Sequence, residues 1–100
     1  MTHSPPSDPV VIEKTMSASA DEFHRSMAVL DATRAPATTH ELACGTGTVT
    51  ITYVPLPAVT LGSLLALPRA RVTLRFDSTS PADRAAFLPR FDLAFQRGGG

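Results

Sequence analysis

The chain has 100 residues, nine basic and nine acidic, and therefore no net charge when histidine is neutral. This length predicts a single domain with a small hydrophobic core, and the balanced charge does not favour nucleic acid as a partner. No apolar run reaches the roughly 18 residues of a membrane-spanning helix, and the first residues lack the basic and apolar parts of a signal peptide, so we expect a cytoplasmic protein without membrane contact.

The N-terminal region is predicted to hold a disordered leader and then a strand. Residues 1–8 contain two prolines and few large apolar side chains, a composition that cannot bury enough surface to order the chain. We place one α+β domain over residues 9–97. Its first strand covers residues 10–17, where apolar and charged side chains are mixed on both faces, so the pattern leaves the inward face undecided.

A helix is predicted to follow this strand. Ser19 with Glu22 three residues later forms a capping-box sequence, which is typical of a helix start. The spacing of i, i+4 and i+7 then marks a buried stripe, formed by Phe23, Met27 and Leu30. We expect the helix to end near residue 33, because Pro36 prevents its continuation.

Two strands are predicted next, over residues 38–44 and 48–54. In the first, one face carries His40, Leu42 and Cys44. The second alternates threonine with larger apolar residues, and we expect its inward side to carry Val49, Ile51 and Tyr53. The glycines at 45 and 47 favour a hairpin turn between the strands, and a single strand bent at a glycine bulge is the alternative.

Residues 54–68 are the most apolar part of the chain. Two prolines, Pro55 and Pro57, are expected to end the preceding strand, and Thr60 is expected to cap a short helix before Pro68. The segment supplies six large aliphatic side chains: Leu56, Val59, Leu61, Leu64, Leu65 and Leu67. We expect some of them to stay exposed, and so to form an interface or the wall of an apolar pocket.

The last strand and the last helix complete the predicted fold. Residues 69–76 alternate, with Arg69, Arg71 and Arg75 outward and with Ala70, Val72, Leu74 and Phe76 inward. Ser80 and Pro81 then favour a helix start, and the helical spacing of Phe87, Phe91 and Phe95 continues it through Pro89 with a kink.

The alternative for this last region is a helix that ends at residue 88, followed by a strand over residues 91–96. We expect a flexible tail at residues 98–100. The predicted fold is a two-layer α+β sandwich of order β-α-β-β-β-α, in which an antiparallel sheet of about four strands carries both helices on one face.

Few residues suggest chemistry. His40 and Cys44 are four residues apart, but on a strand this spacing separates them by about 13 Å, so we expect no metal site and no cofactor. No arrangement of residues in the sequence identifies a catalytic group. The outward Arg69, Arg71 and Arg75 are a possible anion-binding stripe, although solvation and pairing with Glu13 or Glu41 explain them more simply.

These observations favour a small non-catalytic protein that acts by protein association, as a homodimer through residues 54–68. The first alternative is a module that binds a small apolar ligand, with residues 54–68 as its lid. The second alternative is an enzyme whose reaction the sequence does not identify.

Overall fold

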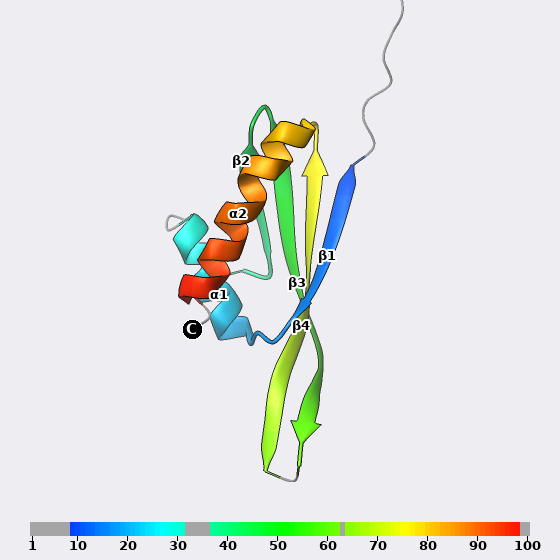
Figure 1. The fold of residues 1–100 in the computed structure, drawn as a ribbon, viewed down its shortest axis with the longest axis vertical. Helices are drawn as coiled ribbons and strands as arrows, with labels where there is room; N and C mark the ends of the chain where they lie inside the picture. Colours follow the sequence, from blue (N-terminus) through cyan, green and yellow to red (C-terminus); the bar gives the residue numbers. More distant parts are fainter. Residues whose placement is uncertain (1–8, 32–36, 63, 99–100) are drawn as a thin grey trace, which may run out of the picture.

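The structure, a computed structural model, describes residues 9–31, 37–62 and 64–98. The elements in chain order are β1 (Val10–Met16), α1 (Ala20–Leu30), β2 (Thr39–Cys44), β3 (Gly47–Leu61), β4 (Leu65–Asp77) and α2 (Pro81–Gly98). The four strands form one antiparallel sheet in the order β1-β4-β3-β2. Both helices lie on the same face of this sheet (Figure 1). The predicted two-layer α+β sandwich is therefore confirmed.

The two predicted chain ends fall largely outside this description. The leader predicted at residues 1–8 lies outside the described residues, as do residues 99–100 of the predicted tail. Gly98, the first residue of that tail, is the last residue of α2.

The core lies between the helices and the two central strands. The inward residues predicted on β3 and β4 are all buried, namely Val49, Ile51, Tyr53, Ala70, Val72, Leu74 and Phe76. From the helices, the same cluster is completed by Phe23, Met27, Phe87 and Phe91. The hydroxyl of Tyr53 donates a hydrogen bond to the carbonyl of Ala18 at 3.1 Å, so its polar end is satisfied inside the core.

The inward face of β1 holds a lysine, which explains why the sequence left that face undecided. Lys14 is half-buried, as are Ile12 and Met16 on the same side. Its Nζ lies 3.3 Å from Oδ1 of Asp92 and 5.9 Å from the centre of the Phe91 ring, both in α2. The aliphatic stem thus packs against the sheet edge while the amine reaches the solvent at the rim.

Helix α1 begins as predicted and ends earlier. The Ser19 hydroxyl accepts from the Glu22 N–H at 3.2 Å, and Glu22 Oε1 accepts from the Ser19 N–H at 3.1 Å, so the capping box is confirmed. The helix ends at Leu30, and the predicted continuation to residue 33 is wrong at least at Asp31, which has extended backbone. Residues 32–36 lie outside the described part of the chain.

A tight hairpin joins β2 to β3, and the alternative of one long bent strand is wrong. Gly45 has φ +60°, a conformation that favours glycine. A Cβ atom on Gly47 would overlap the carbonyl oxygen of Asp77, so the hairpin also needs a glycine for close approach to the end of β4.

Helix α2 runs without interruption from Pro81 to Gly98, with Pro89 inside it, and the alternative strand over residues 91–96 is wrong. The helix start is confirmed, since Ser80 Oγ accepts from the Asp83 N–H at 3.1 Å. An interior proline costs about 3 kcal/mol. Burial of Phe87 and Phe91 offsets this cost, because each contributes roughly 1.5–3 kcal/mol.

The largest departure from the sequence-based prediction is in residues 54–68. Instead of a strand that ends at Pro55 and a short helix that starts after Thr60, β3 and β4 both continue and pair with each other up to Leu61 and Leu65. The paired strands extend beyond the rest of the sheet (Figure 1). We call this extension, residues 54–62 and 64–69, the arm.

We expect Pro89→Ala to stabilise the protein by about 2 kcal/mol, which raises the melting temperature by roughly 10 °C. Alanine restores an N–H that donates to the carbonyl of Ala85 one turn earlier, and position 89 is exposed, so little burial is lost. Thermal unfolding followed by circular dichroism measures the change.

Pro81→Ala is the matched control for that variant. Pro81 stands in the first turn, where no intrahelical hydrogen bond is missing, so this change should move the melting temperature much less. An unchanged or lower melting temperature for Pro89→Ala would show that the proline is needed to place Phe91.

Candidate association surface

Among the described residues, the arm has no neighbouring strand on either side. The pairing of β2 with β3 ends at Thr39 opposite Thr52, and the pairing of β1 with β4 ends at Met16 opposite Ala70. Beyond these residues, β3 and β4 pair only with each other. The arm is therefore a two-stranded ribbon, which by itself is at best marginally stable in water.

The large aliphatic side chains of the arm share one face. Directly paired residues of an antiparallel ladder point to the same face, and the pairs on this face are Val54 with Arg71, Leu56 with Arg69, Val59 with Leu67 and Leu61 with Leu65. This is the face of the sheet that the helices leave uncovered, because the buried residues of β4 alternate with Arg69 and Arg71. The opposite face carries no large aliphatic side chain among its paired residues in the arm, which are Pro55, Thr60 and Ala66.

A bulge is what brings these side chains to one face. Leu56 pairs with Arg69 and Val59 pairs with Leu67, so two residues of β3, 57 and 58, stand opposite the single residue Pro68. In a regular strand, residues 56 and 59 would point to opposite faces. The extra residue reverses the alternation, so Val59 and Leu61 join Leu56.

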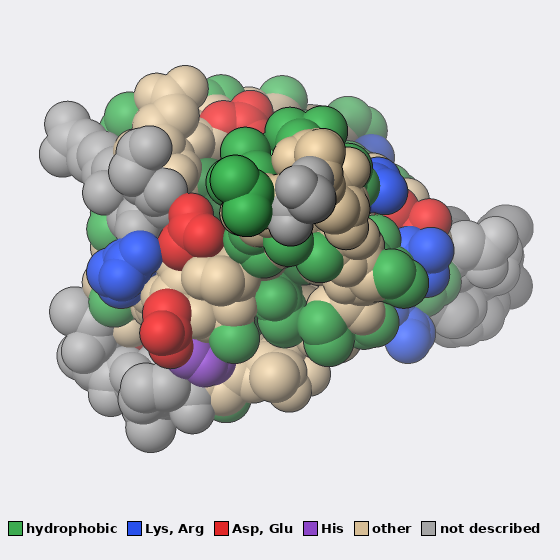
Figure 2. Space-filling model, turned by 90° about the horizontal axis from the view of Figure 1, so that it is seen from below, with side chains coloured by type: hydrophobic (Ala, Val, Ile, Leu, Met, Phe, Trp, Pro, Cys, Tyr) green, Lys and Arg blue, Asp and Glu red, His purple; other side chains and the backbone are tan. Residues whose placement is uncertain are grey.

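The aliphatic face of the arm is exposed. The side chains on it or at its tip, with their exposed fractions, are Val54 (41%), Val59 (37%), Leu61 (51%), Leu64 (97%), Leu65 (51%) and Leu67 (36%). Leu56 is half-buried. Seen from below, hydrophobic side chains gather around the end of the arm (Figure 2). An apolar cluster of this kind on a small protein is typical of a binding surface.

The prolines of the arm fit the strands because their missing N–H groups lie at the outer edges. The Tyr53 N–H donates to the carbonyl of Thr38, away from β4, so two residues further on Pro55 also has its backbone nitrogen on that outer side. The carbonyl of Pro68 accepts from Ser17 Oγ at 3.0 Å on the β1 side, so its nitrogen too faces outward. The prediction that proline ends the strand was wrong because no ladder bond is lost at such positions.

These edge prolines also limit how another chain can bind. A proline at a strand edge blocks the addition of a further strand, since it offers no donor there. The arm is therefore suited to contacts through its aliphatic face rather than to extension of the sheet.

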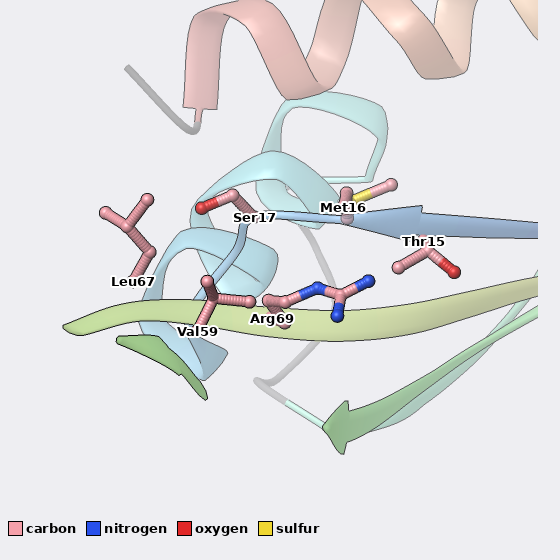
Figure 3. Close-up of a pocket in the computed structure, with 6 residues that line it drawn as sticks. All are labelled: Thr15, Met16, Ser17, Val59, Leu67 and Arg69. Atoms are coloured by element: carbon pink, nitrogen blue, oxygen red, sulfur yellow. The ribbon is translucent and has the colours of Figure 1, made fainter. Parts of the chain in front are cut away.

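A groove lies where the arm leaves the sheet. It has a volume of about 260 Å³ and is lined by Thr15, Met16, Ser17, Val59, Leu67 and Arg69 (Figure 3). Two walls thus come from the arm and from the end of β1. The sequence pattern did not indicate the residues at the end of β1, because their place in the groove depends on where the arm departs from the sheet.

The arginine stripe lies on the uncovered face of the sheet, as predicted. All three side chains, Arg69, Arg71 and Arg75, are exposed. Arg75 Nε lies 3.4 Å from Oδ1 of Asp77, so this arginine is paired with an acidic side chain of its own strand. Arg71 and Arg75 are four residues apart on one strand, about 13 Å, so the stripe does not gather its charges around one point. Only Arg69 borders the groove.

Cys44 and His40 face the helices and are each 4% exposed. The Cys44 thiol donates to the carbonyl of Asp83 at 3.6 Å, and a small hollow of about 120 Å³ lies beside it. Burial, and secondarily the negative charge of Asp83, raises the pKa of the thiol, so the nucleophilic thiolate is disfavoured. His40 Nε2 lies 3.0 Å from the carbonyl oxygen of Ala37. No group of three or more metal-ligating side chains occurs among the described residues.

Comparisons with protein-family models, with curated proteins and with solved structures found no match to this chain. No helix in the described part of the chain is long and apolar enough to cross a membrane.

The Cys44 thiol gives a testable pH dependence. Because its pKa is raised in the folded state, the folded chain holds this proton more tightly than the unfolded chain. The resulting stability is fully present below the unfolded pKa, roughly 8.5, and is lost as the pH rises through the folded value. We expect the melting temperature to fall more steeply above pH 8.5 in the wild type than in Cys44→Ser. Parallel profiles for the two proteins would show that the pKa of the thiol is the same in the folded and unfolded chains.

Proposed function

We propose that this protein acts by association with a second copy of itself, through the aliphatic face of the arm. The observation that carries the proposal is the exposure of Val59, Leu61, Leu64, Leu65 and Leu67 on a ribbon that pairs with no further strand in the described part of the chain. An exposed two-stranded ribbon gains stability when its apolar face is covered.

The free energy of burial supports a dimer in which both copies cover their arms. The exposed fractions of the arm's aliphatic side chains amount to about three fully exposed side chains per copy, each worth roughly 1.5–3 kcal/mol on burial. Two copies would gain about 9–18 kcal/mol, against an association cost of roughly 4–15 kcal/mol. Toward the upper end of this cost, the gain exceeds the cost only when most of the surface is covered on both copies, which favours a symmetric contact.

A second candidate function is the binding of a small apolar ligand, and the groove at the base of the arm favours it. Its volume of about 260 Å³ is close to the lower end of the roughly 300–1,000 Å³ range of ligand pockets. An experiment distinguishes the two candidate functions. A binding module is a monomer whose melting temperature rises with added n-decanol, whereas the association candidate is a concentration-dependent dimer.

We expect Leu64→Asp and Leu65→Asp to shift the protein toward monomer while its far-ultraviolet circular dichroism is unchanged. Each change places a charge in the proposed contact, and both side chains are at least half exposed, so the core is not disturbed. Light scattering over a range of concentrations measures the association.

Leu93→Asp is the matched control. Leu93 lies on α2 and is 46% exposed, close to the 51% of Leu65, but it is not part of the arm. It should leave the oligomeric state unchanged. A wild-type protein that is monomeric at high micromolar concentration, or dissociation by Leu93→Asp alone, would contradict the proposal.

A further inference from the structure

We infer that two copies associate with their arms antiparallel, and that Leu64 at the tip of each arm enters the groove of the other copy. This inference rests on the proposed function and specifies its geometry. The groove of each copy, lined by Met16, Val59 and Leu67, is then filled by a residue of the second copy.

The positions of the tip and the groove along β4 fit this arrangement. Leu64 precedes Leu67 by three residues, and Ala70, which pairs with Met16 in β1, follows Leu67 by three residues. Three residues of a strand span about 10 Å. A two-fold axis beside Leu67 and perpendicular to the arm therefore carries the tip of one arm to the end of β1 in the other copy, where the groove lies (Figure 3).

The sizes of the two parts agree as well. Leu64 is 97% exposed, so no described residue of its own chain covers it. A leucine side chain has four carbon groups, and at roughly 30 Å³ for each water-sized group it fills about 120 Å³. The groove of about 260 Å³ holds this side chain and leaves room beside it.

Charge favours the antiparallel arrangement over the parallel one. With the axis beside Leu67, the two copies of Arg69 lie on opposite sides of it, about 13 Å apart along the arm, which exceeds the screening length of about 10 Å at 0.1 M salt. If the two-fold axis ran along the arm instead, the two arms would be parallel. Each arginine of the stripe, Arg69, Arg71 and Arg75, would then lie opposite the same arginine of the second copy. Like charges directly opposite each other disfavour that contact.

Cysteine cross-linking tests the arrangement in the full chain with Cys44→Ser, which removes the native thiol. One preparation carries Leu64→Cys and a second carries Thr15→Cys at the exposed rim of the groove. We expect the oxidised mixture to lose its monomer band and to gain a band of twice the mass on a non-reducing gel. Each chain of this mixture carries a single cysteine, so no disulfide can form within one chain. In a chain with both changes such a bond is excluded as well, because Thr15 pairs with Arg71, seven residues or about 23 Å along β4 from Leu64.

Val11→Cys is the matched control for the groove position. Val11 is exposed on the same strand and the same face as Thr15, but about 13 Å further from the arm. We expect no cross-link between it and Leu64→Cys. Equal cross-linking at the two positions, or cross-linking of Leu64→Cys with itself, would overturn the antiparallel arrangement.

The double variant Thr15→Cys with Leu64→Cys tests whether the exchange is reciprocal. A two-fold arrangement closes with two disulfides, so oxidation should stop at the dimer. A ladder of larger species would show head-to-tail contacts and would overturn the inference.

Light scattering separates failure of this inference from failure of the proposed function. A dimer that forms no cross-link between positions 64 and 15 overturns the inference and leaves association through the arm in place. A monomer overturns both.

Discussion

The pairing of β3 with β4 is the constraint on which the rest of the structure depends. The pairing runs from the core pairs, such as Ile51 with Leu74, out to Leu61 with Leu65 at the end of the arm, with one shift of register at the bulge between Leu56 and Val59. In the core, a slip of one residue would turn every inward side chain of a strand into water. Burial of Val49, Ile51, Val72 and Leu74 therefore fixes the register there, and the pairing carries it as far as Leu56 opposite Arg69, beyond which the bulge shifts it by one residue.

This constraint explains how a ribbon with little burial of its own can be ordered. The arm starts from strands that are already held by α1, α2 and the two outer strands. Its base is further tied to β1 by the hydrogen bond from Ser17 to the carbonyl of Pro68. The entropy cost of ordering the arm is thus reduced at its base, while the hydrophobic side chains at its end stay exposed.

The sequence predicted the fold where local pattern and burial agree. The alternation in residues 48–54 and 69–76 identified the inward faces, and the capping sequences at Ser19 and Ser80 located both helix starts. The sequence-based prediction failed in the arm because a one-dimensional pattern does not contain two physical facts. The side of the strand to which a proline nitrogen points decides whether the strand survives, and a bulge changes the phase of the alternation.

The candidate surface was likewise only partly predictable. The six aliphatic residues of the arm stood out as an uncharged apolar stretch, and the structure leaves five of them exposed and Leu56 half-buried. The groove was missed, because Thr15, Met16 and Ser17 lie at the end of β1 and just after it, far from the arm in sequence, and carry no motif. Only the sheet order, which places β1 beside β4, brings them to the base of the arm.

The bulge at residues 57 and 58 has a consequence for how such a surface arises and is lost in evolution. The chemical character of the arm depends on an insertion of one residue as well as on the identity of its side chains. Loss of a single codon there would send Val59 and Leu61 to the opposite face, with almost no change in composition and none in the core. An exposed aliphatic face of this kind can therefore be gained or removed in one genetic step that leaves the buried core residues unchanged.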